Sequence, residues 1–287
     1  MKRAATFLCS GLFIALLPLE GARAVPNGGY RVEMAPLVLL AGGGETLGAD
    51  RTVTPGDLVM TTGIGVARAA HVENPATVTV AGITRSLSDN SLLVGATLVG
   101  EAAPGGIFCA GAERPDKISR DEVRPGLGKR FRAIVQLCLV DANNDGVFEK
   151  AFVAGAMWPQ ENGMIDIPAI RYRGISNAPL RDSWFHVTFE KGAPLQGPVL
   201  NIDAQITGQR VNLAFAKIGA DRSSMRKYPV ERSVKRQYPY TMELGDARIT
   251  LKGFEPESRQ LQLSVDKPFQ TRFLDFEMIN YTIYIYH

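Results

Sequence analysis

The amino-acid sequence predicts an all-β protein, built as an antiparallel β-sandwich or a related architecture of several sheets, with one short helix at most. Apolar and polar residues alternate with a period of two along many short segments, whereas the 3.6-residue period of an amphipathic helix is scarce. Turn-forming pairs such as Pro55-Gly56 and Asn74-Pro75 separate these segments. Of the 287 residues, 45% are hydrophobic and 21% are charged, which is enough apolar content for a sizeable core.

The expected strands follow one another along the whole chain. In the N-terminal third they cover residues 37–40, 57–62, 66–72, 77–83 and 91–101. Further along, alternation predicts strands over residues 131–140, 147–153, 184–190, 200–206, 211–215, 260–266 and 273–278. The one helix start is Ser119, because Glu122 stands three residues later in a capping-box spacing. Pro125-Gly126 would end this helix within two turns.

The first 24 residues have the three-part pattern of a secretory signal peptide. Lys2 and Arg3 are followed by an almost uncharged apolar run over residues 4–19, and the small residues Ala22 and Ala24 stand at positions −3 and −1 of a cleavage point after Ala24. We therefore expect cleavage there and a periplasmic or secreted protein. The alternative is an uncleaved membrane anchor, for which the apolar run is short.

The charge balance argues against a nucleic-acid partner. Cleavage would remove three basic residues and one acidic residue, so 29 basic residues would face 28 acidic ones in the mature chain. Proteins that bind nucleic acid normally carry a strong basic excess. We expect the mature region, residues 25–287, to form one β-rich unit, and a charged segment near residues 113–130 is an alternative point of subdivision.

Two cysteines remain after cleavage, Cys109 and Cys138. An even number of cysteines in an exported chain predicts a disulfide, and this one would also tether the charged segment between them. Two unpaired thiols are the alternative.

The motif between Asp141 and Gly146 resembles the calcium loops of EF-hand proteins. Asp141, Asn143 and Asp145 occupy the first three ligand positions, and Glu149 could add a further oxygen. The resemblance covers six residues, a phenylalanine stands where the bidentate glutamate should be, and the flanks alternate like strands. Two interpretations are therefore open and compatible: a β-hairpin turn closed by local hydrogen bonds, and a Ca²⁺ site.

A basic stretch over residues 222–237 also contains tyrosines. It could dock an anionic envelope polymer, with tyrosine rings stacking on sugars. The alternative is a solvated loop whose tyrosines lie against a sheet edge and in which Pro229 and Pro239 prevent ladder pairing. The candidate binding residues are Arg226, Lys227, Tyr228, Lys235, Arg236 and Tyr238.

No motif of a nucleophile elbow, a zinc-binding helix or a phosphate-binding loop occurs in the chain. We therefore expect an exported, disulfide-stabilised protein with a binding or structural role in the cell envelope, its partner an envelope polymer or another envelope protein. One alternative is an outer-membrane β-barrel, favoured by Tyr284 and Tyr286 near the end of the chain but opposed by the short strands. Another is a secreted carbohydrate hydrolase, whose carboxylate pair would be assembled by folding.

Overall fold

The computed structural model describes residues 30–42, 46–80, 83–89, 91–99, 105–110, 116–119, 132–155, 163–193, 197–234 and 237–278. These residues form strands in several antiparallel sheets and no helix, which confirms the predicted fold class. The expected signal peptide, most of the 113–130 segment and the helix expected beyond Ser119 lie outside the described residues. Ser119 itself is the last residue of a strand.

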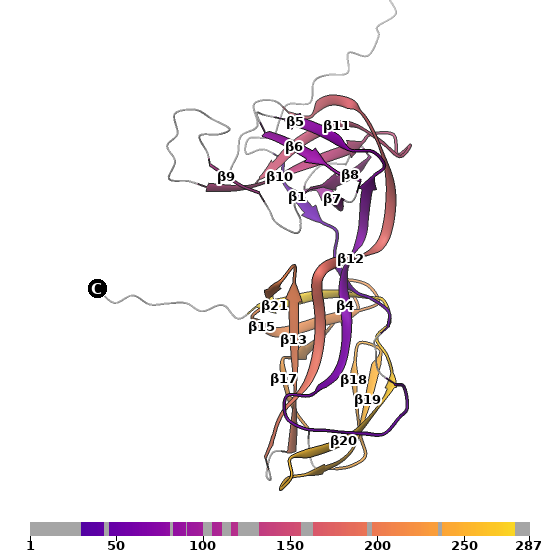
Figure 1. Ribbon diagram of the computed structural model, residues 1–287, viewed down its shortest axis with the longest axis vertical. Coiled ribbons are helices and arrows are strands. Elements are labelled where there is room, and N and C mark those ends of the chain that lie inside the picture. The colour runs from indigo at the N-terminus through magenta and orange to yellow at the C-terminus, as the bar shows by residue number, and fades with distance from the viewer. Residues whose placement is uncertain are drawn as a thin grey trace, which may run out of the picture.

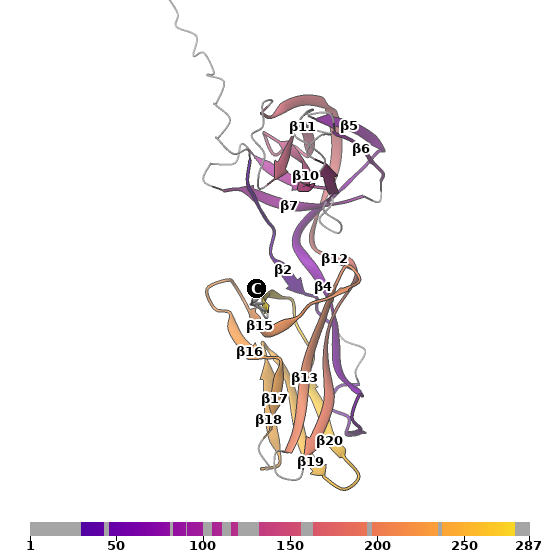
Figure 2. The same cartoon turned by 90° about the vertical axis from the view of Figure 1, so that its left-hand side faces the viewer.

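Two lobes joined by a narrow waist make up the described part of the chain (Figures 1 and 2). The upper lobe contains β1 (Val32–Met34), β5 (Ala76–Val80), β6 (Ile83–Leu87), β7 (Leu92–Leu98), β8 (Gly106–Cys109), β9 (Asp116–Ser119), β10 (Arg132–Asp141) and β11 (Val147–Gly155). The lower lobe contains β2 (Leu37–Leu39), β3 (Arg51–Val53), β13 (Gly197–Ile206), β14 (Gln209–Arg210), β15 (Leu213–Gly219), β16 (Arg226–Pro229), β17 (Glu231–Ser233), β18 (Tyr240–Leu244), β19 (Ala247–Glu255), β20 (Gln260–Lys267) and β21 (Arg272–Met278). Two long strands, β4 (Leu58–Val72) and β12 (Ile165–Ala193), run through both lobes.

In the upper lobe the ladder of strands returns to its starting point. The order β12-β11-β10-β8-β7-β4 is continuous, and β4 pairs again with β12, so six strands form a closed ring. Cys138 on β10 lies opposite Cys109 on β8, and a disulfide joins the two residues as predicted. The tethered segment between the cysteines therefore starts and ends on neighbouring strands.

In the lower lobe one bent strand connects the two ends of the ladder. β16 pairs with β15, and β17 pairs with β13. Between them, the Val230 N–H donates to the carbonyl of Ala214 at 3.2 Å, while the Val230 carbonyl accepts from the Ile202 N–H at 2.8 Å. A separate four-stranded sheet, β18-β19-β20-β3, contributes to the same hydrophobic core as this ladder.

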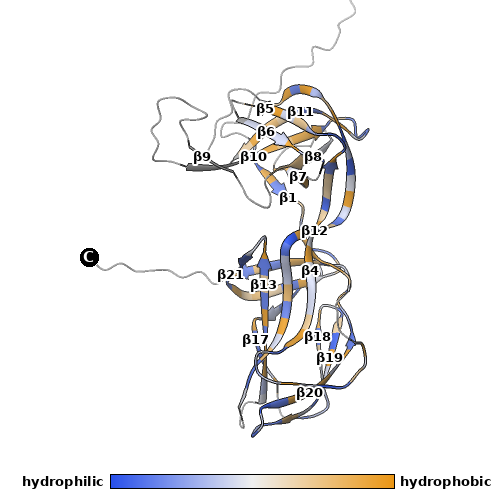
Figure 3. Ribbon diagram, viewed as in Figure 1, coloured by the Kyte–Doolittle hydropathy of each residue, from blue (hydrophilic) through white to orange (hydrophobic). Residues whose placement is uncertain are grey.

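The alternation of side-chain burial along β12 explains why one face of this strand lies in the core and the other faces the surface. Phe185, Val187 and Phe189 are fully buried in the lower core, whereas Trp184 and His186 between them are half-buried on the other face. The colours along β4 and β12 in Figure 3 change from residue to residue in the same way. Each fully buried side chain of this size stabilises the fold by about 1.5–3 kcal/mol.

The waist is a place of close strand contact. The sequence predicts two strands over residues 57–62 and 66–72, but the structure has one continuous strand, which runs through Gly63 and Gly65. A Cβ atom at Gly65 would lie 2.5 Å from the carbonyl oxygen of Ala178 on β12. The small residue thus lets β4 and β12 approach each other where the lobes meet.

Candidate functional site

The calcium-like motif forms a tight turn between β10 and β11. Asp141 is completely buried, and its carboxylate accepts hydrogen bonds from the N–H of Asp145 at 3.1 Å, the N–H of Gly146 at 2.9 Å and the Tyr172 hydroxyl at 2.8 Å. Gly146 has a φ of +87°, which a glycine adopts without strain. The turn residues predicted from the sequence therefore act together to reverse the chain.

The electrostatics of Asp141 follow from these contacts. Burial by itself raises the pKa of the Asp141 carboxyl, but the hydrogen bonds from Gly146, Tyr172 and Asp145 outweigh it, so the net pKa lies below the ordinary value. Burial also raises the pKa of the Tyr172 hydroxyl, and its hydrogen bond to Asp141 adds to this effect. The pair is held as a neutral phenol donating to a carboxylate.

The predicted metal ligands do come together in this turn. Carboxylate oxygens of Asp141, Asp145 and Glu149 lie within 4.8 Å of one another. Most of these oxygens already accept from the turn: Asp145 from the Val147 N–H at 2.9 Å, and Glu149 from the Ala142 N–H at 3.1 Å. The Asn143 side-chain oxygen accepts from the Asp145 N–H at 3.1 Å. Hydrogen bonds within the turn thus engage most of the candidate ligand oxygens, and Ca²⁺ binding stays a prediction.

The basic stretch has a different structure from the predicted loop. It forms β16 and β17, and Pro229 is the last residue of β16, where its missing N–H interrupts little. The expectation that Pro229 prevents pairing is therefore wrong, whereas Pro239 does lie outside the strands. Tyr228 is buried and cannot offer its ring face to a sugar. Lys227 pairs with Glu277 at 2.7 Å, while Arg226 is exposed. Tyr238 packs against the lower core, and Lys235 and Arg236 lie outside the described residues.

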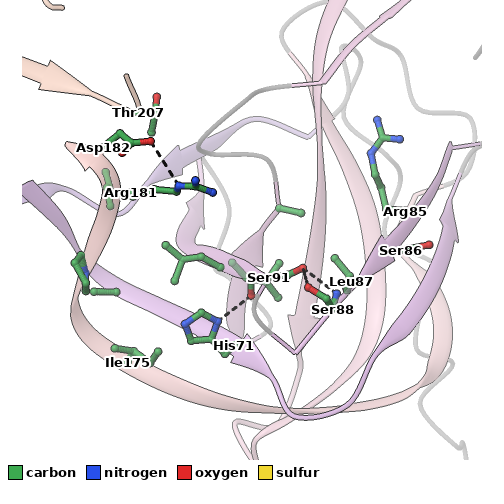
Figure 4. Close-up of a pocket in the computed structure, with 16 residues that line it drawn as sticks. His71, Arg85, Ser86, Leu87, Ser88, Ser91, Ile175, Arg181, Asp182 and Thr207 are labelled. Carbon is green, nitrogen blue, oxygen red and sulfur yellow. Dashed lines mark hydrogen bonds and ion pairs between the residues drawn. The ribbon is translucent and has the colours of Figure 1, made fainter. Parts of the chain in front are cut away.

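A groove of about 930 Å³ lies between the lobes. Its upper side comes from β6, β7 and the turn between them, and its lower side comes from the part of β12 that crosses the waist, together with Thr207. Figure 4 shows Arg85 and Ser86 on one side, Arg181 and Asp182 on the other, and His71 between them. Its hydroxyl-bearing lining residues are Ser86, Ser88, Ser91 and Thr207, and its apolar ones include Leu92, Ile175 and Pro179.

The lower side of the groove is a bulge in β12. Pro179 lies opposite Gly65 and Trp184 lies opposite Gly63, so residues 180–183 stand against a single residue of β4. Such extra residues re-aim side chains and are common beside functional sites. Here they project Arg181 toward the groove.

Hydrogen bonds to the next hairpin hold this bulge in place. The Asp182 carbonyl accepts from the Gly208 N–H at 3.0 Å and from the Gln205 side-chain amide at 3.1 Å, and the Ser183 hydroxyl accepts from the Thr207 N–H at 2.8 Å. Asp182 and Thr207 have φ values of +50° and +49°. Thr207 and Gly208 form the turn between β13 and β14, so these hydrogen bonds tie the bulge of β12 to that turn.

The groove presents cationic and hydrogen-bonding groups. Arg181 contacts Asp182 at 3.5 Å, but both side chains are mostly exposed, at 85% and 67%, so this ion pair contributes little. Arg85 donates to the Thr84 carbonyl at 3.2 Å. Arginine side chains of both lobes thus line the groove.

Sequence reasoning did not find this groove. Its residues come from β4, β6, β7, β12 and the β13–β14 turn, which only the folded chain brings together. The one local signal in the sequence is the polar run Arg181-Asp182-Ser183, which stands directly before the alternating segment that begins at Trp184.

Comparison with known proteins assigns neither a family nor a function to the chain. No protein-family model matches the chain, no curated protein matches it in sequence, and no solved structure matches its fold. Within the described ranges, no helix is long and apolar enough to cross a membrane.

Proposed function

We propose that the protein is an exported, non-enzymatic binding protein of the cell envelope, periplasmic or secreted, and that the groove between its lobes holds an anionic envelope polymer. The observation that carries this proposal is the groove itself, with Arg85 and Arg181 on opposite sides. The signal-peptide pattern and the disulfide fit a protein that folds in an oxidising compartment.

The side chains of the groove suit an acidic glycan. Guanidinium groups bind carboxylate or phosphate through paired hydrogen bonds. The hydroxyls of Ser86, Ser88 and Ser91 are both donors and acceptors, as sugar hydroxyls require. Leu92 and Ile175 offer apolar surface to the C–H faces of sugar rings.

Binding is favoured over hydrolysis because the described lining of the groove contains one carboxylate rather than a pair. Glycoside hydrolysis normally uses two carboxyl groups that flank the scissile bond. Among the described residues that line the groove, Asp182 is the single carboxylate, and it already contacts Arg181. The basic stretch is a weaker candidate for docking the polymer because Lys227 is ion-paired and Tyr228 is buried.

Export and binding can be tested on the same preparation. The protein from the osmotic-shock fluid should have the intact mass of residues 25–287. It should bind polygalacturonate or alginate in a salt-sensitive way and should not bind dextran. Arg85→Gln/Arg181→Gln should weaken binding by about tenfold or more, because two charge-assisted contacts are lost.

A matched control removes the same charge elsewhere. Arg248→Gln/Lys252→Gln takes two cations from β19 on the four-stranded sheet and should bind like wild type. Equal weakening in both double variants would show that net charge alone draws the polymer, and this would contradict the proposed site.

A further inference from the structure

Two aromatic rings are stacked on the outer face of the lower lobe, where β13, β12 and β4 lie side by side (Figures 1 and 2). The rings of Trp184 and His186 have centroids 3.8 Å apart and planes 13° apart. Both side chains are half-buried, and Trp184 is not among the residues that form the lower core. Because His186 covers one face of the indole and the side chain is still only half-buried, the rest of the ring presents apolar surface to solvent.

A row of polar side chains on β13 borders these rings. The three cross-strand pairs that make up this surface, which we call the Trp184 face, are Trp184–Gln205, His186–Asp203 and Thr188–Asn201. Residues directly opposite each other in an antiparallel ladder project to the same side of the sheet. All six side chains are half-buried, so each can reach both its neighbours and a ligand.

Hydrogen bonds orient the polar row without using all of its capacity. The Asn201 amide donates to the Asp203 carboxylate at 3.3 Å, and the Gln205 amide donates to the Asp182 carbonyl at 3.1 Å. A carboxylate has about four acceptor sites, and an amide oxygen accepts independently of the donating nitrogen. The row therefore retains acceptors that face the same side as the indole.

The charges on and beside the Trp184 face balance. Burial lowers the pKa of the His186 imidazole more than the Asp203 carboxylate raises it, and Arg210 lowers it further. His186 is therefore neutral at about pH 7, with one ring nitrogen donating and the other accepting. Arg210 lies opposite Gln205 on β14 and carries the charge opposite to that of Asp203. This surface thus complements an uncharged ligand.

We propose that the Trp184 face binds an uncharged, β-linked glycan, one pyranose ring of which packs on the indole while its hydroxyls bond to the row on β13. A pyranose with equatorial hydroxyls has a flat C–H face and a polar rim, which matches an apolar ring bordered by amides and a carboxylate. The proposal is independent of the proposed function, because it involves no side chain of the groove.

Titration with uncharged hexasaccharides, followed by tryptophan fluorescence, tests this proposal. The chain has two tryptophans, so Trp158→Phe makes Trp184 the single reporter in the full mature chain. We expect cellohexaose or chitohexaose, which are both β-linked and uncharged, to change its emission in a saturable way. Dextran, whose α-linked chain lacks a flat ribbon shape, should leave the emission unchanged.

Variants measured by calorimetry identify the side chains that bind. Trp184→Ala should weaken hexasaccharide binding by about tenfold or more, and Trp184→Phe should weaken it less because a smaller ring remains. The matched control is Leu47→Ala, which removes an exposed apolar side chain elsewhere. Gly48 beside it bonds to Val265 of the four-stranded sheet, and this variant should bind like wild type. Unchanged melting temperatures would show that the variants are folded.

The outcomes separate this proposal from the proposed function. Absence of binding for both hexasaccharides, or equal affinities of wild type and Trp184→Ala, overturns the Trp184 face and leaves the groove unaffected. Arg181→Gln should leave hexasaccharide binding within about twofold of wild type, because distant sites act independently. Loss of hexasaccharide binding in Arg181→Gln, or equal weakening in Leu47→Ala, would likewise contradict the proposal.

Discussion

Asp141 has a structural role in its turn that the calcium-like motif alone does not indicate. The DxNxDG spacing is typical both of calcium loops and of tight turns, and in the structure the buried carboxylate accepts from two backbone N–H groups and one phenol. Sequence reasoning placed the turn and its residues correctly because these contacts are local. The Tyr172 hydroxyl, 31 residues away, could not be predicted from spacing.

Asp141→Asn should destabilise the protein by about 2 kcal/mol or more at pH 7, because the amide cannot accept all three hydrogen bonds. Since the folded pKa of Asp141 lies below its ordinary value, its contribution is complete above about pH 4 and is lost as the pH falls through the folded pKa. Urea unfolding of both proteins at neutral and acidic pH measures this difference, which should shrink in acid. The exposed Asp145→Asn serves as the control and should cost less.

At the scale of elements, the turn between β10 and β11 should not depend on a bound ion. Because its oxygens already accept hydrogen bonds, we expect EDTA to leave the melting temperature unchanged. Differential scanning fluorimetry with EDTA and with millimolar Ca²⁺ makes this measurement. A rise of several degrees with Ca²⁺, absent in Asp145→Asn, would instead establish a calcium site.

The crossing of β4 and β12 gives a second prediction for an element. Gly65→Ala should destabilise the protein by about 1–3 kcal/mol, because its Cβ would overlap the Ala178 carbonyl and the backbone would have to shift. Gly174→Ala, in the same ladder, should be nearly neutral because nothing lies within 4 Å of its Cβ. Chemical unfolding of the two variants provides the comparison, and equal losses would contradict a close crossing at Gly65.

Strand prediction succeeded where alternation is unbroken and failed where the chain changes register. Residues 260–266 and 273–278 were predicted because one face of each is buried, and they correspond to β20 and β21. The 29 residues of β12 were predicted only as the segment 184–190, because the bulge at 180–183 reverses the pattern of inward and outward residues. The groove was missed for the same reason, since it lies at this break.

At the scale of the molecule, the upper lobe is closed by a covalent bond as well as by its ladder. Cys109 and Cys138 are both fully buried and 29 residues apart. Replacing both by alanine should lower the free energy of unfolding by about 3–4 kcal/mol through the entropy of loop closure. Calorimetry should show this loss mainly in the upper lobe if the lobes unfold separately, whereas an unchanged profile would mean that the disulfide adds no stability.

An ion pair also connects the two lobes. Arg222, in the turn after β15, pairs with Glu33 of β1 at 2.6 Å, although 189 residues separate them. Both side chains are more than half exposed, so the pair adds little to stability.

The central claim is that an anionic polymer binds between the lobes, and hydrogen-exchange mass spectrometry with polygalacturonate tests it most directly. The account predicts slower exchange in peptides that cover residues 83–93 and 175–183. Peptides that cover residues 226–233 should exchange at the same rate with and without the polymer. Protection confined to the basic stretch, or an exchange pattern that the polymer leaves unchanged, would contradict it.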